Sequence, residues 1–164
     1  MNELQKLHQM VWRFRAVMEP HWATPGPVDC LRYAFCEAGE AMDAWLRQQR
    51  PNDSRNNERQ PDVLDELADC AIMLLSAVPE VNWEIARTEL FPLEAIDKLP
   101  QRLGELFKCF QSAFFVDDAV FTVSLIANYQ DMNLEERIVG RLWKIAHKHA
   151  PAEVFSRAVD VIYE

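Results

Sequence analysis

The second of two carboxylate pairs in this chain runs directly into a stretch without charge, and this junction is what most constrains the fold. Glu66 and Asp69 stand three residues apart, and residues 70–78 (CAIMLLSAV) carry no charged side chain. Such spacing puts two side chains on one side of a helix, about a turn apart. A helix that is apolar all round is a buried one. The pair is therefore expected to point inward, where unpaired carboxylates are costly and need a partner.

An earlier pair, Glu37 and Glu40, has the same spacing and is separated from the second by 25 residues. In a helical projection Glu37 lies at one edge of an apolar stripe and Glu40 just beyond it. The stripe consists of Leu31, Ala34, Phe35, Ala38, Ala41, Met42, Trp45 and Leu46. Two such helices packed together would aim four carboxylates at one point. Four converging charges repel one another, so the arrangement predicts a site for a hard divalent cation, Mg²⁺ above all.

The alternative interpretation is that these acids are ordinary surface charges. Acidic residues occupy 26 of 164 positions, so pairs with this spacing also arise by chance. Asp62, Asp65 and Glu66 are equally suited to the N-terminus of a helix, where negative charge is favourable. The conjunction of two pairs on consecutive helices, one continuing into a charge-free segment, favours the cation site.

The rest of the chain is expected to be helical too. Glycine is scarce, at 4 residues, and helical periodicity predicts helices over 2–18, 28–49 and 61–78, with a shorter one after Asn82. The polar segment 51–61 reads as a loop, either a lid over the acidic site or a solvated connection. We expect a single all-α domain over 1–164, like a four-helix bundle, with residues 1–90 as its metal-binding half.

The second half, 91–164, is either a degenerate copy of the first or an unrelated set of amphipathic helices. Residues 117–127 parallel 65–75 at an offset of 52 positions, with Phe121 where the first half has Asp69. Glu105 and Lys108 stand where a first motif would fall. If the duplication is real, this half has lost its ligands and serves as scaffold.

Composition excludes several classes of protein. The formal charge of −9 argues against a nucleic-acid polymer as partner, because such binding rests on Lys and Arg. No apolar stretch approaches the roughly 20 residues of a membrane span, and nothing at the N-terminus reads as a signal peptide. The four cysteines lack C-x-x-C spacing, and Cys36 and Cys70 are expected to be buried thiols. These features favour a cytoplasmic protein. No Glu-x-x-His accompanies the pairs, which weighs against a di-iron bundle.

The combination E-x-x-E, spacer, E-x-x-D resembles the signature of the all-α nucleoside triphosphate pyrophosphohydrolases. This superfamily includes MazG-like proteins, dimeric dUTPases, dCTP pyrophosphatases and phosphoribosyl-ATP pyrophosphohydrolase. Residues 36–44 (CEAGEAMDA) and 65–75 (DELADCAIMLL) are similar to its two motif helices. Trp22-Ala-Thr-Pro25 is similar to the segment that precedes the first motif in some members. The match spans about residues 20–90.

The resemblance implies a MazG-type fold and a homodimer that hydrolyses nucleoside triphosphates to monophosphate and pyrophosphate, in nucleotide-pool sanitation. It implies Mg²⁺, with Mn²⁺ as a substitute, held by Glu37, Glu40, Glu66 and Asp69, or by all but one of them if one glutamate acts as general base. The substrate contacts that it suggests are Trp22, Arg32, Tyr33 and Asn82.

Cations that could grip phosphate are sparse in the first half, and the helical half offers Arg137, Arg141 and Lys144 instead. Two other functions stay open. One is a non-catalytic helical scaffold or regulator that retains the fold. The other is a metal-dependent phosphatase acting on another phosphorylated metabolite.

Overall fold

The computed structural model of the chain describes residues 3–22, 25–50, 62–78, 98–109, 114–127, 129 and 132–164. This part of the chain is all-α, which confirms the predicted class, and contains no strand. Its helices are α1 (Glu3–Met18), α2 (Pro27–Gln48), α3 (Val63–Ala77), α4 (Leu99–Cys109), α5 (Phe114–Ala127), α6 (Leu134–His149) and α7 (Ala152–Tyr163). The expected helix after Asn82 and the segment 51–61 lie outside the described residues.

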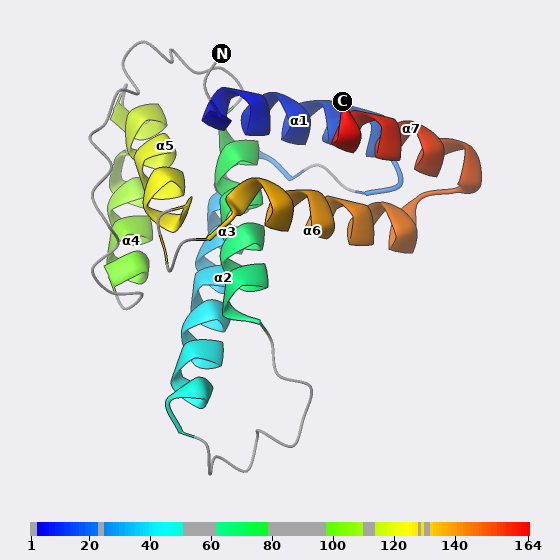
Figure 1. The fold of residues 1–164 in the computed structure, drawn as a ribbon. Coiled ribbons are helices and arrows are strands. Elements are labelled where there is room, and N and C mark those ends of the chain that lie inside the picture. Colours follow the sequence, from blue (N-terminus) through cyan, green and yellow to red (C-terminus); the bar gives the residue numbers. More distant parts are fainter. Residues whose placement is uncertain are drawn as a thin grey trace.

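Helix α3 is the centre of the molecule. It runs antiparallel to α2, and it also packs against α1, α5 and α6 (Figure 1). The charge-free residues 70–78 are all buried except Met73, which is half-buried. The expectation of a buried helix is therefore confirmed, and the acidic residues of α3 lie in its N-terminal half, where that burial begins.

A row of small side chains makes the contact between α2 and α3. Leu31 and the alanines Ala34, Ala38, Ala41 and Ala44 are buried on α2. Because alanine side chains are short, the two backbones approach closely and the contact row is narrow. Side chains on the flank of the row stay outside it. Phe35 is 46% exposed and Cys36 is exposed, so the predictions that buried these two residues are wrong.

Side chains from α1 hold the C-terminal end of α3. His8 Nε2 donates to the Val78 carbonyl oxygen over 2.5 Å, and Trp12 Nε1 donates to the carbonyl oxygens of Leu75 (3.0 Å) and Val78 (3.1 Å). Carbonyl groups at a helix end have no partner within the helix. These bonds satisfy them and fix the position of α3 along its axis.

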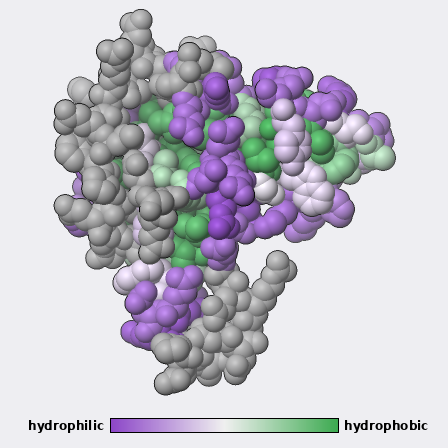
Figure 2. All heavy atoms as spheres, in the orientation of Figure 1, coloured by the Kyte–Doolittle hydropathy of each residue, from purple (hydrophilic) through white to green (hydrophobic). Residues whose placement is uncertain are grey.

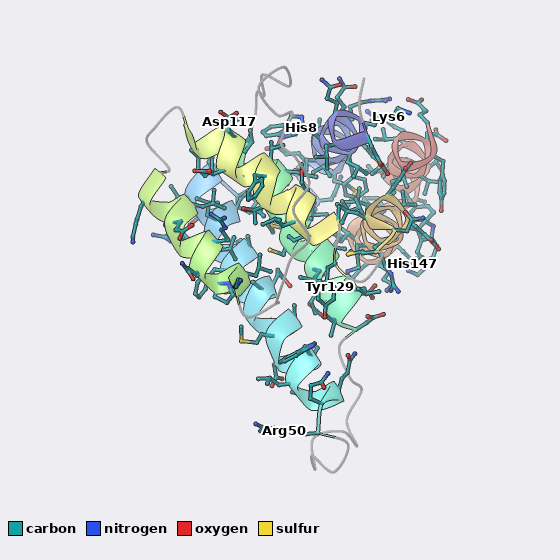
Figure 3. The ribbon with its side chains drawn as sticks, turned by 60° about the vertical axis from the view of Figure 1, so that its left-hand side comes forward. Lys6, His8, Arg50, Asp117, Tyr129 and His147 are labelled. Atoms are coloured by element: carbon teal, nitrogen blue, oxygen red, sulfur yellow. The ribbon has the colours of Figure 1, made fainter. Side chains whose placement is uncertain are left out.

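The helices α1, α6 and α7 form a second group, laid across the α2–α3 pair (Figure 1). Asn133 caps α6 by accepting from Glu136 N at 3.1 Å, and His147, Lys148 and His149 occupy its last turn, where positive charge is favourable. The far end of α2 extends beyond this group, as Arg50 shows in Figure 3. This arrangement places one side of α6 over the acidic part of α3.

Hydrophilic residues cover much of the coloured surface in the space-filling view, and hydrophobic residues show between them in the middle and towards the right of the molecule (Figure 2). None of the described helices combines the length and the apolar composition needed to cross a bilayer.

Candidate metal centre

Three glutamates from α2 and α3 converge at the contact between these helices. A carboxylate oxygen from each of Glu37, Glu40 and Glu66 lies within 4.8 Å of the other two. We call these three residues the glutamate triad. Glu37 and Glu66 are half-buried, and Glu40 is exposed. The triad therefore offers hard oxygen donors at an edge that solvent can reach, which is the donor set that Mg²⁺ and Mn²⁺ prefer.

The charges in the triad are not compensated by the protein alone. Burial raises the pKa of Glu37 to about 8, and the negative charges of Asp69, Glu40 and Glu66 and a hydrogen bond with Glu66 add to the effect. Burial and the charges of Asp69 and Glu40 also raise the pKa of Glu66, and the charge of Arg141 and the hydrogen bond with Glu37 only partly oppose this. Near neutral pH the folded protein therefore keeps a proton on Glu37. A divalent cation at this place would relieve the same repulsion, so the residues fit such an ion.

A buried cysteine lies near the triad. Cys70 lies one turn along α3 from Glu66 and is fully buried. Burial raises the pKa of its thiol, and the charges of Glu37 and Asp69 raise it further. The thiol therefore stays protonated near the carboxylates.

Asp69, the fourth predicted ligand, is engaged differently. Its carboxylate accepts two hydrogen bonds from Arg141 on α6, from Nε to Oδ1 at 2.8 Å and from Nη2 to Oδ2. Burial raises the pKa of Asp69, partly opposed by Arg141. The structure brings Asp69 close enough to the triad to raise the pKa of Glu37, but a guanidinium group occupies its oxygens.

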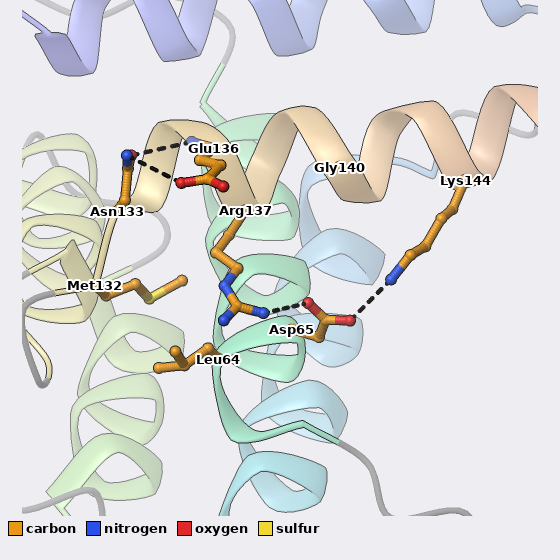
Figure 4. Close-up of a pocket in the computed structure, with 8 residues that line it drawn as sticks. All are labelled: Leu64, Asp65, Met132, Asn133, Glu136, Arg137, Gly140 and Lys144. Atoms are coloured by element: carbon orange, nitrogen blue, oxygen red, sulfur yellow. Dashed lines mark hydrogen bonds and ion pairs between the residues drawn. The ribbon is translucent and has the colours of Figure 1, made fainter.

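Two more cations of α6 contact the N-terminal acids of α3. Arg137 Nη1 donates to Asp62 at 2.9 Å. Arg137 Nη1 also donates to Asp65 at 3.1 Å, and Lys144 Nζ donates to Asp65 at 3.0 Å (Figure 4). Burial alone would raise the pKa of Asp65, but the hydrogen bonds of Lys144 and Arg137 and the charge of Arg141 lower it below its ordinary value. The cations of α6 thus form ion pairs with the acids on one side of the N-terminal end of α3.

The acidic residues around α3 form two groups with different partners. Asp62, Asp65 and Asp69 each contact a cation of α6. Across the described residues, no ion pair joins the glutamate triad to a cation. The uncompensated negative charge of the site is therefore concentrated at the triad. Sequence reasoning assigned no role to Asp65, because a favourable place at a helix N-terminus was sufficient to explain it.

Of the predicted substrate residues, Arg32 and Tyr33 are neighbours on α2, whereas Trp22 follows the end of α1. Tyr33 stands one turn before Glu37 on α2 and is 52% exposed. Arg32 is paired with Asp29 on the exposed surface, Nη1 to Oδ1 at 2.8 Å. Trp22 packs edge-on to Phe14 and lies under the guanidinium of Arg15, so the core covers part of its ring. Asn82 is outside the described residues.

A duplication would place a second site in the helical half, near Glu105 and Phe121. There Glu105, Asp118 and Phe121 surround a cavity of only about 10 Å³. The guanidinium of Arg102 lies over the Phe121 ring, 5.3 Å from its centroid, and also pairs with Glu105 at 3.0 Å. Arg102 therefore contacts both Glu105 and Phe121 at this place. The duplication itself stays a prediction.

No protein-family model matches this chain, and comparison with curated proteins and with solved structures finds no match either. The resemblance to the pyrophosphohydrolases therefore rests on the two motifs themselves. Three of their four carboxylates converge in space, and the fourth, that of Asp69, lies one turn along α3 from Glu66 and is bound by Arg141.

Proposed function

We propose that this chain is a Mg²⁺-dependent nucleoside triphosphate pyrophosphohydrolase that acts in nucleotide-pool sanitation. The observation that carries the proposal is the glutamate triad, in which three half-buried or exposed carboxylates converge and the pKa of Glu37 rises to about 8. Mutual repulsion of this kind costs stability in the free protein. A bound cation would explain why these carboxylates lie together, whereas a purely structural role would not.

In this proposal Glu37, Glu40 and Glu66 hold the cation, and Asp69 completes the set. A bound Mg²⁺ would neutralise charge on the phosphates and lower the pKa of a water molecule near them. Phosphoryl transfer depends mainly on positioning and charge neutralisation, and the carboxylates serve both by fixing the cation between α2 and α3. Tyr33, exposed one turn from Glu37, is our candidate for contact with the base or sugar.

The test is product analysis with a panel of ribo- and deoxyribonucleoside triphosphates and Mg²⁺. We expect nucleoside monophosphate and pyrophosphate from one or a few members of the panel, and no product when the cation is removed with EDTA. Orthophosphate as the first product would instead indicate a metal-dependent phosphatase. No product from any nucleotide would contradict the proposal.

One observation favours a different class, a non-catalytic helical scaffold or regulator. Arg141 already compensates Asp69 with two hydrogen bonds, as a purely structural ion pair would. A scaffold has no need of the triad, however, and should tolerate replacement of all three glutamates by glutamine. Cation binding that is lost in the triple variant supports the enzyme, and unchanged cation binding supports the scaffold.

We also propose that the protein works as a homodimer, since Val28 and Phe35, two turns apart on one face of α2, expose apolar side chains. Large apolar side chains left in contact with water are a feature of protein interfaces. Light scattering on the purified chain should then give twice its mass of 19.1 kDa. A single-chain mass at micromolar concentration, unchanged by Phe35→Ser, would contradict the dimer.

A further inference from the structure

Asp69 has two competing partners. Arg141 reaches it from α6 through two nitrogen atoms, and the pair is mostly shielded, with 27% of the Arg141 side chain and 13% of the Asp69 side chain exposed. A planar guanidinium matched to both carboxylate oxygens leaves neither oxygen ready for another cation. Asp69 can therefore act as a fourth ligand beside the triad only if its hydrogen bonds with Arg141 are broken.

A pocket close to Arg141 could receive its side chain once Asp69 no longer binds it. A pocket of about 510 Å³ lies beside it between α3 and α6, and Asp65, Arg137 and Lys144 are among its lining residues (Figure 4). Gly140 lies between the two cations along α6, and a Cβ there would meet no atom within 4 Å. The surface at this point is therefore open, and Arg137 and Lys144 flank it.

The charges of the pocket change with the position of Arg141. While Arg141 is bound to Asp69, Arg137 and Lys144 form ion pairs with Asp62 and Asp65. The positive charges at the pocket are then balanced by these carboxylates. With Asp69 satisfied elsewhere, Arg141 keeps only its contact with Asp65, 3.4 Å from Nη1 to Oδ2, and Arg137 and Lys144 already share that carboxylate. Three cations then face two carboxylates, Asp62 and Asp65, and the group gains a positive charge. A polyphosphate is the ligand whose charge and length suit three cations spread over two helical turns.

We propose that Arg141 is an exchange residue: it occupies Asp69 in the metal-free protein, releases it to a divalent cation, and then binds a polyphosphate between Arg137 and Lys144. The inference rests on the proposed function, because the cation and the polyphosphate are those of that site. Arg141 is a positioning residue for the cation and a direct contact for the polyphosphate. It thereby makes each ligand favour the other, since coupling between two sites is reciprocal.

The first arm of the test is calorimetric titration with Mn²⁺ alone. Arg141→Gln should raise the affinity for Mn²⁺ by about fivefold or more, the lower end of ordinary site coupling, and Arg141→Lys should raise it less. Arg137→Gln is the matched control, because it removes the same charge one turn earlier on α6 but frees only Asp62 and Asp65. In an Asp69→Asn background, Arg141→Gln should no longer raise the affinity.

The second arm is titration with inorganic pyrophosphate in EDTA. Asp69→Asn, which frees Arg141 without a cation, should bind pyrophosphate more tightly than the wild type, and the double variant with Arg141→Gln should lose that gain. Circular dichroism verifies the helical content of each variant.

Two failures can be told apart. If Arg141→Gln and Arg137→Gln change Mn²⁺ affinity equally, or if the effect persists in Asp69→Asn, the exchange is wrong while the metal centre stands. If the wild type binds no Mn²⁺, both the exchange and the proposed function are wrong.

Discussion

Glu66→Gln is expected to abolish nucleotide hydrolysis and to weaken Mn²⁺ binding by about 100-fold or more, since even residues that only orient metal ligands typically contribute 10–100-fold. Glutamine keeps the volume of the side chain, but it has one oxygen atom and no negative charge. Glu66 is also the single contribution of α3 to the triad, so its loss leaves two ligands on α2 alone. Initial rates of pyrophosphate release and calorimetric titration with Mn²⁺ measure the two effects.

The control for this variant is Glu105→Gln. Glu105 stands in the helical half where a duplicated first motif would fall, and it pairs with Arg102 at 3.0 Å. Its replacement removes the same charge from the protein without touching the triad, so turnover and Mn²⁺ affinity should stay close to the wild type. An equal loss in both variants would show that net charge, rather than the triad, governs cation binding.

Glu37→Gln is expected to stabilise the metal-free protein at pH 8 and to remove most of its pH dependence between pH 5 and pH 8. The pKa of Glu37 rises from its ordinary 4.5 to about 8 in the folded protein. Between these two values the folded state holds a proton that the unfolded state has lost. The free energy of unfolding of the wild type therefore falls as the pH rises through this window.

The size of this effect is limited by solvent. One unit of pKa corresponds to about 1.4 kcal/mol, but the Glu37 carboxyl is only half-buried and is screened by water, which keeps the gain to about 1–2 kcal/mol. Glutamine can still donate a hydrogen bond to Glu66, so the variant removes the charge and keeps the contact. Urea unfolding of both proteins in EDTA at several pH values gives the comparison.

Other groups act in the same experiment. The raised pKa values of Glu66 and Asp69 add to the loss of stability with rising pH and leave a small residual slope in Glu37→Gln. Asp65, whose pKa is lowered, acts in the opposite direction and only below about pH 4, where its protonation would break its bonds to α6. With saturating Mg²⁺ the sign of the main effect should reverse, because the ion competes with protons for the carboxylates. A wild-type stability in EDTA that rises from pH 5 to pH 8 would exclude a repelling cluster.

Much of the α2–α3 pair could be predicted from local patterns. The helix expected over 28–49 is found as α2 (Pro27–Gln48), and that over 61–78 as α3 (Val63–Ala77). The charge-free residues after Asp69 correctly indicated a buried helix, since an element without charged side chains has no favourable exposed face. The burial of Phe35 was wrong because periodicity shows the middle of an apolar stripe but not how wide a strip the neighbouring helix covers.

The partner of Asp69 could not be predicted in the same way. Arg141 lies 72 positions further along the chain, and the contact exists only because α6 crosses α3 at one particular level. The cations Arg137, Arg141 and Lys144 are visible as a basic stripe on one helix, which suggested phosphate binding. Whether such a stripe meets acids or solvent depends on tertiary packing, which spacing along a helix does not encode.

The most direct test of the metal centre is anomalous diffraction from a crystal of the protein grown with Mn²⁺. The proposed metal centre should give a strong anomalous peak among the carboxylates of Glu37, Glu40 and Glu66, and no such peak in a crystal of Glu66→Gln grown under the same conditions. Saturating Mn²⁺ with no peak at the triad, or with a peak that persists in Glu66→Gln, would contradict it.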